Sequence, residues 1–206
     1  MKKVTVWLVL GLFATIAASV SGAQEPLEAL RGPINEVVSV LQAPQYQKGD
    51  QVEAGREKIW SVIASLFDFT EMAKRSLARN WRVFSPMERK KFSEVFARFL
   101  GNTYLDKIQK DYQNEEVVFG KQEMLNSTKA LVKTAVMRDT VEIPVDYKML
   151  NRGGGWRVYD VNIEGVSLVK NYRTQFGKIL MRKSPAELIE RLQKKVAEQK
   201  EQGEQE

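Results

Sequence analysis

The spacing of hydrophobic residues changes within the stretch 153–176, and the change predicts a strand followed directly by a helix. The first half of the stretch alternates as a strand does, with Trp156 and Val158 on one face. After a Glu164-Gly165 turn, hydrophobic side chains recur at helical spacing, at Val166, Val169, Tyr172, Phe176 and Ile179. A strand that passes through a glycine turn into a helix places that helix beside the sheet. The apolar side of the helix and one sheet face can then enclose a ligand between them.

Helical spacing also dominates the first half of the chain. It predicts helices over residues 26–42, 52–66, 68–77 and about 86–108, and a last helix after residue 184. Pro33 is expected to interrupt the first helix or to open a second segment within it. Ser85 and Glu88 have the spacing of a capping box, and Ser184 and Glu187 repeat it. The helix after Ser85 is the longest and strongly aromatic, which fits either an ordinary core helix or one wall of a wide apolar cavity.

Strand-like alternation follows in the second half. It predicts strands over residues 117–119, 128–137, 140–149 and 156–163, joined by short turns. Because proline cannot donate a ladder hydrogen bond, we expect a bulge or a sheet edge at Pro144. Consecutive strands joined by short turns favour an antiparallel meander with helices on one face. The predicted fold is α+β, an antiparallel sheet of about four strands packed against several helices and enclosing an apolar pocket.

Residues 1–23 are predicted to be a cleaved signal peptide, because Lys2-Lys3 precede an apolar run that ends in the small residues Ser21-Gly22-Ala23. A membrane anchor is the alternative, although the run is short for a bilayer core of ~30 Å. Residues 24–196 are predicted to form a single domain, and residues 197–206 are polar enough to be predicted disordered. The signal predicts a periplasmic or secreted protein, and a chain without cysteine must be held together by packing.

Composition narrows the chemistry that the chain can perform. It has no histidine, which removes the Ser-His-Asp arrangement and nearly every zinc site, so we predict no catalytic and no metal-binding residues. Asp160 beside Tyr159, and Asp146 with Glu142, most resemble acid–base pairs, but solvated or cross-strand-paired positions explain both better. Without Lys2 and Lys3 of the predicted signal peptide the chain has 30 basic and 26 acidic residues, and this net charge of +4 is mild and spread along the chain, unlike a nucleic-acid-binding protein.

Several short sequence motifs follow one another along the chain in a fixed order. Phe67-Asp68-Phe69, Met72-Ala73 and Trp81-Arg82 precede WRVYD at 156–160, EGVSL at 164–168 and NYR at 171–173. Together, over residues 52–192, they resemble the MlaC (toluene-tolerance) family of periplasmic phospholipid-binding proteins. The resemblance implies a curved sheet that encloses acyl tails together with the helices. Family members often carry glycine where this chain has Ala78.

The resemblance also implies a ligand and partner proteins. It implies phospholipid as cargo and two membrane partners, and we separately predict no cofactor and a monomer. The partners are an inner-membrane ABC transporter complex that includes an MCE-domain protein and an outer-membrane lipoprotein–porin complex. We therefore predict a soluble periplasmic carrier that shuttles phospholipid between the two membranes, and not an enzyme. A cone-shaped hydrolase or isomerase that uses Asp160 or Asp146, and a periplasmic adaptor or chaperone, remain alternatives.

The side chains predicted to line the lipid pocket share a large apolar surface. They are Phe92, Phe96 and Tyr104 from the long helix, Val132, Val136, Val145 and Tyr147 from the sheet, and Trp156, Val158, Val166, Tyr172 and Phe176 from the stretch 153–176. Lys170 or Arg173 at the mouth would meet the headgroup phosphate, and a structural salt bridge is an equal alternative for Arg173.

Overall fold

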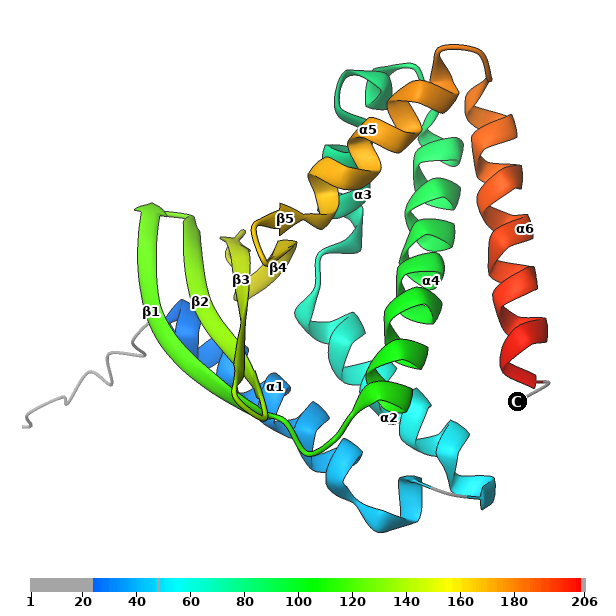
Figure 1. The fold of residues 1–206 in the computed structure, drawn as a ribbon. Coiled ribbons are helices and arrows are strands. Elements are labelled where there is room, and N and C mark those ends of the chain that lie inside the picture. Colours follow the sequence, from blue (N-terminus) through cyan, green and yellow to red (C-terminus); the bar gives the residue numbers. More distant parts are fainter. Residues whose placement is uncertain (1–23, 48, 205–206) are drawn as a thin grey trace, which may run out of the picture.

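The computed structural model describes residues 24–47 and 49–204, which form six α-helices and one antiparallel sheet (Figure 1). The predicted signal peptide and the last two residues lie outside the described residues. The helices are α1 (Pro26–Gln42), α2 (Val52–Leu66), α3 (Phe69–Leu77), α4 (Pro86–Asp111), α5 (Leu168–Leu180) and α6 (Pro185–Glu204), with short 3₁₀ segments η1 (Pro44–Tyr46), η2 (Gly49–Gln51) and η3 (Ala78–Arg82). Within the described residues, no helix combines the length and the apolarity needed to cross a bilayer.

The sheet is a meander in which strands that follow one another in the chain are neighbours in space. Its order is β1 (Glu116–Asn126), β2 (Lys129–Arg138), β3 (Val141–Asn151), β4 (Trp156–Ile163) and β5 (Val166–Ser167), and every pair is antiparallel. The turn between β2 and β3 contains Asp139 with a positive φ of 52°. The α+β class and the antiparallel meander predicted from the sequence are confirmed.

The first strand is much longer than the three residues predicted for it. β1 continues to Asn126, and a register shift between Phe119 and Gln122 divides its pairing with β2. An extra residue at such a shift breaks the alternation by which a strand is recognised in a sequence. The pattern therefore reveals only the part of β1 that precedes the shift.

Pro144 occupies a central strand without disturbing its register. It pairs with Ala135 of β2, and its carbonyl accepts a hydrogen bond from the amide of Glu164 on the opposite side. Pairing between β3 and β4 begins one residue later, at Val145 and Ile163. Pro144 thus lies at the end of the β3–β4 ladder, where its missing N–H leaves no ladder hydrogen bond unmade, and neither the expected bulge nor a free sheet edge occurs at this position.

The Glu164-Gly165 turn leads into a strand and not directly into a helix. Both residues have positive φ, 50° and 84°, and they return the chain along β4 so that Val166 pairs with Ile163. α5 begins only at Leu168, where the side chain of Ser167 accepts a hydrogen bond from the amide of Lys170. The predicted helical start at Val166 is therefore corrected to a strand residue.

The other helices agree with the sequence pattern except at two places. α1 runs through Pro33 without a break. α6 continues to Glu204, which corrects the predicted disorder of residues 197–204. These residues are mostly Ala, Glu, Gln and Lys, which have high helix propensity. Gln199 also donates to Thr103 Oγ1 of α4 at 2.8 Å, which holds this part of α6 against its neighbour.

Apolar packing is divided into three clusters, although a domain usually has one contiguous core. The helical cluster joins α3, α4, α5 and α6. The sheet cluster joins one face of β2, β3 and β4 to α1 and the end of α2. The base cluster joins α1, α2 and α4. In Figure 1 the sheet and α4 stand on opposite sides, with α1 and α2 at the base and α5 above. Among the described residues, α4 packs against α2, α3 and α6 and, through aromatic rings, against α5, and no strand packs closely against it.

Ala78 ends α3 in a conformation that suits glycine. Its φ of 49° and ψ of −123° place an exposed alanine in a left-handed region where a Cβ is strained. We expect Ala78→Gly to raise the free energy of unfolding by about 1 kcal/mol and the melting temperature by about 2–4 °C. Urea unfolding and calorimetry measure both quantities. Ala197→Gly, on an exposed helical position of α6, is the matched control and should lower stability by up to about 1 kcal/mol. Equal destabilisation by both changes would contradict strain at Ala78.

Candidate functional site

One face of the sheet is apolar over three strands. The register aligns Val132, Tyr147 and Val161 across β2, β3 and β4. The neighbouring rows on the same face are Ala130–Met149–Val158 and Thr134–Val145–Ile163. A register shift between Lys148 and Met149 lets Trp156 and Val158 face the same side as Val161. The prediction that Val132, Val145, Tyr147, Trp156 and Val158 share one sheet face is therefore correct as geometry, and their role in lipid binding stays a prediction.

The predicted helical wall is an aromatic cluster packed against itself. Phe96 stacks on Phe92 at 5.6 Å between ring centroids and meets Tyr172 and Phe176 edge to face at 5.2 and 5.3 Å. Phe92 and Phe96 are fully buried. Burial raises the pKa of the Tyr172 hydroxyl, and its hydrogen bond with Tyr104 acts in the same direction. Phe92 and Phe96 are thus ordinary core residues in this structure. Of the three side chains predicted on the long helix, only Tyr104 is partly exposed.

A stacked aromatic trio lies where the three clusters meet. Phe69 stacks on Phe67 at 5.7 Å and on Trp60 at 5.5 Å. All three side chains are partly exposed, and Phe67 contacts both the helical and the sheet clusters. Gly101 of α4 leaves room for the Trp60 ring, because a Cβ there would lie 2.7 Å from it. The sequence prediction omitted this trio from the site. Phe67 and Phe69 were visible only as family motif residues, and Trp60 only as one member of a helical stripe.

Tyr147 combines two properties that rarely occur together in a packed core. Burial raises its pKa to about 12, yet its side chain is partly exposed and rests against the sheet cluster. Within the described residues its hydroxyl has no hydrogen-bond partner. The apolar sheet face around Tyr147 is therefore not fully covered by the packed helices. Val136, Ile143, Ile163 and Leu168 are also partly buried against the same cluster.

Val166 and the two cations predicted for the mouth lie on the outside. Val166 is 58% exposed on β5, so it does not line an interior wall. The correction follows from the Glu164-Gly165 turn, which makes Val166 a short strand residue and not the first residue of an apolar helical stripe. Lys170 and Arg173 are exposed on α5, and Arg173 Nε donates to the carbonyl of Arg75 at 2.9 Å. Arg173 therefore holds α5 to α3 by a hydrogen bond to the backbone.

Asp160 is buried, and its carboxylate holds neighbouring elements together. Its carboxylate pairs with Lys148 across the strands at 3.2 Å, which agrees with the predicted cross-strand pairing. It also accepts hydrogen bonds from Ser167 Oγ at 2.8 Å and from the amide of Val169 at 3.1 Å. This carboxylate caps the start of α5 and fixes it to β4. The described residues contain no group of three or more acidic side chains arranged to hold a metal ion.

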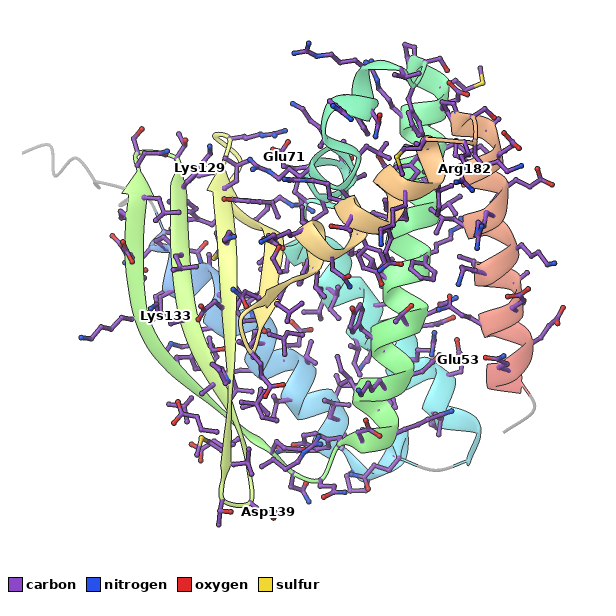
Figure 2. All side chains as sticks on the ribbon, turned by 45° about the horizontal axis from the view of Figure 1, so that its top comes forward. Glu53, Glu71, Lys129, Lys133, Asp139 and Arg182 are labelled. Carbon is purple, nitrogen blue, oxygen red and sulfur yellow. The ribbon has the colours of Figure 1, made fainter. Side chains whose placement is uncertain are left out.

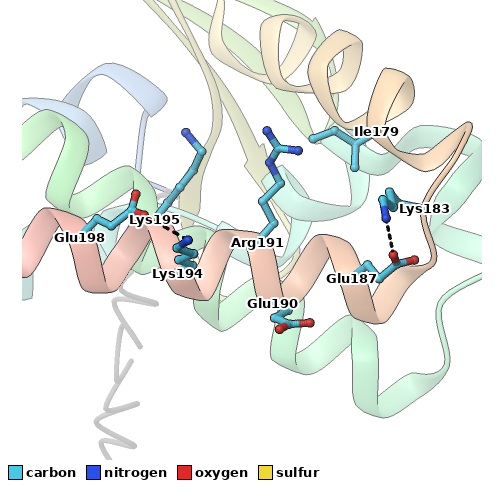
Figure 3. Close-up of a pocket in the computed structure, with 8 residues that line it drawn as sticks. All are labelled: Ile179, Lys183, Glu187, Glu190, Arg191, Lys194, Lys195 and Glu198. Carbon is cyan, nitrogen blue, oxygen red and sulfur yellow. Dashed lines mark hydrogen bonds and ion pairs between the residues drawn. The ribbon is translucent and has the colours of Figure 1, made fainter.

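Pockets lie along the helices. One of about 530 Å³ follows α6 beside the end of α5, and seven of its lining side chains are charged, with Ile179 the exception (Figure 3). A second, about 130 Å³, adjoins it and reaches Tyr172, Phe176 and Leu192 of the helical cluster. A third, about 150 Å³, lies beside Trp60 and Leu105. Charged walls do not suit acyl tails, so the pocket along α6 is not the predicted lipid site, and the apolar pocket between sheet and helices stays a prediction.

Comparison with known proteins gives one family. The profile of the MlaC protein family matches residues 32–194. The toluene tolerance protein Ttg2D of Pseudomonas putida is 24% identical over 177 residues, which cover 83% of this chain and 80% of that protein. A phospholipid-binding protein from Ralstonia solanacearum, solved in complex with a phospholipid, superposes with a TM-score of 0.76 at 21% identity, over 85% of this chain and 99% of that one.

Proposed function

The chain belongs to the MlaC family, and we propose that it is a periplasmic phospholipid carrier that moves lipid between the outer and inner membranes without chemical change. The observation that carries this proposal is the division of the apolar interior into a helical and a sheet cluster joined at the rim by Phe67. Because each cluster is packed within itself, the two can separate around acyl tails without exposing the centre of either. The phospholipid held by the structural relative from Ralstonia solanacearum supports the same reading.

We propose that the tails contact partly exposed apolar side chains that pack against the three clusters. These are Tyr104, Val136, Ile143, Tyr147 and Ile163, with the trio Trp60, Phe67 and Phe69. The fully buried residues that the sequence predicted to line the pocket, such as Phe92 and Phe96, then lie behind this surface and support it. This assignment requires a space between the clusters that opens as the acyl tails enter. The accessible apolar side chains form the walls of that space.

The competitor for the tails is the bilayer and not water. Burying two tails of about fifteen methylenes each would gain on the order of 24 kcal/mol relative to water. That gain exceeds the practical ceiling of about 21 kcal/mol on non-covalent affinity, so a water reference cannot describe a carrier that must release its cargo. Against a bilayer, where the tails are equally dry, the balance is close to zero. Small differences in affinity at the docking complexes then decide in which direction lipid moves.

The family resemblance supports the proposed partners. They are an inner-membrane ABC transporter complex with an MCE-domain protein and an outer-membrane lipoprotein–porin complex, between which the carrier would exchange its cargo. Export through the predicted signal peptide of residues 1–23 would place the protein in the same compartment as both.

Native mass spectrometry of protein purified from cells tests lipid carriage. We expect a population whose mass exceeds that of the mature chain by one phospholipid, and tandem dissociation should release a phospholipid ion. Protein stripped with detergent should lose this mass and unfold at a lower temperature, because a ligand that binds only the native state stabilises it. A purely ligand-free mass together with affinity for peptides would instead support an adaptor and would overturn the proposal.

A further inference from the structure

The three most exposed large hydrophobic side chains of the described residues lie at one end of the molecule. Met87 is 81% exposed, Met181 74% and Val83 68%. Val83 and Met87 flank the start of α4, and Met181 begins the turn between α5 and α6. Both segments lie at the top of Figure 1, and η3 packs against α5 there. Protruding apolar side chains gathered at one end mark an interaction site.

The same end holds the positive charge of the protein. Residues 78–91 and 178–187, which we name the basic tip, contain eight of the 32 basic residues but only two of the 26 acidic ones. The rest of the chain is balanced, with 24 of each, so the excess of +6 belongs to the tip. The fold therefore brings together two basic segments that are far apart in the sequence. Both acidic residues, Glu88 and Glu187, are engaged in capping boxes with Ser85 and Ser184.

Among the described residues, six of the eight cations of the tip are free to meet a partner, whereas Arg89 donates to the carbonyls of Trp81 and Arg82 and Lys183 is paired. In the part of the chain that the structure describes, Arg79, Arg82 and Arg182 are exposed and form no ion pair. Lys90, Lys91 and Lys178 share this property, whereas Lys183 pairs with Glu187 at 2.7 Å. Figure 2, in which this end comes forward, shows Arg182 at the end of α5, far from Lys129 and Lys133 on the sheet.

We propose that the basic tip docks on an anionic lipid surface, with Val83, Met87 and Met181 entering the headgroup region and the surrounding arginines and lysines contacting phosphates. Exposed apolar side chains surrounded by cations are the combination that binds an interface of this kind. A protein partner would need more apolar contact area than three side chains supply. The docking is additional to the proposed carriage of lipid and is tested separately from it.

Flotation with vesicles tests this proposal. The purified protein should float with vesicles of phosphatidylethanolamine and phosphatidylglycerol, should remain unbound with phosphatidylcholine vesicles, and should lose binding as salt rises. Arg82→Glu combined with Arg182→Glu should weaken binding by at least about tenfold. Met87→Ser combined with Met181→Ser should weaken it with an unchanged salt dependence, because the charges remain.

Lys129→Glu combined with Lys133→Glu is the matched control, since it reverses two charges on the sheet and should leave vesicle binding unchanged. Equal loss in this control, equal binding to neutral vesicles, or no vesicle binding by the unmodified protein would each overturn the proposal. The lipid mass seen by native mass spectrometry should persist in the tip variants. A failure of docking is thereby distinguished from a failure of carriage.

Discussion

Tyr147→Glu is expected to remove the phospholipid that purifies with the protein, while Tyr147→Phe keeps it. Position 147 lies in the middle of the apolar sheet face, where burial already raises the tyrosine pKa to about 12. A carboxyl group there must be protonated or lie unpaired against acyl tails. A cost of about 2 kcal/mol in the lipid-bound state corresponds to roughly thirtyfold weaker retention. The ratio of lipid-bound to free protein in native mass spectra measures it.

The phenylalanine variant isolates the effect of charge from that of shape. The Tyr147 hydroxyl has no hydrogen-bond partner in the described residues, so its removal should leave both stability and lipid content nearly unchanged. Circular dichroism of both variants checks that they remain folded. Full lipid occupancy in a folded Tyr147→Glu protein would place the tails elsewhere, and the proposed lipid-contact surface would then be wrong.

Local rules of sequence predict most of the elements because those rules act within a few residues. Ser85 and Glu88 form the capping box that their spacing indicates, and α2 begins and ends where its hydrophobic period does. The failures occur where a longer-range contact decides. α6 extends past residue 196 partly because Gln199 reaches Thr103 of a distant helix, and β1 is hidden by a register shift defined only by its partner strand.

The candidate site is harder to predict than the fold, because a packed core and a lipid wall use the same residues. Phe96 and Tyr104 lie on one helix and are both aromatic, yet Phe96 is sealed by α5 and Tyr104 remains partly exposed. Only the arrangement of neighbouring elements separates the two roles. The sheet face could be chosen from alternation, whereas the trio of Trp60, Phe67 and Phe69 forms through contacts between helices that the sequence does not specify.

Asp160→Ala is expected to lower the free energy of unfolding by roughly 3 kcal/mol, the largest stability effect that we predict for a single substitution. The change leaves the buried amide of Val169 without its acceptor, removes the partner of Ser167 Oγ, and breaks the pair with Lys148. α5 then loses the contact that fixes its first turn to β4. Lys148 is partly exposed and can turn to water, so most of the cost falls on the amide and on the helix start.

Asp160→Asn separates the structural role from a catalytic one. An amide oxygen can still accept from Val169 and Ser167, so this variant should lose only about 1 kcal/mol, mainly from the pair with Lys148. Urea unfolding of both variants at neutral pH measures the difference. Because Asp160 joins the helical half to the sheet half at β4, Asp160→Ala should also weaken lipid retention, whereas Asp160→Asn should retain it. Equal stability of the alanine variant and the unmodified protein would show that this carboxylate does not hold α5, and would return it to consideration as an acid or base.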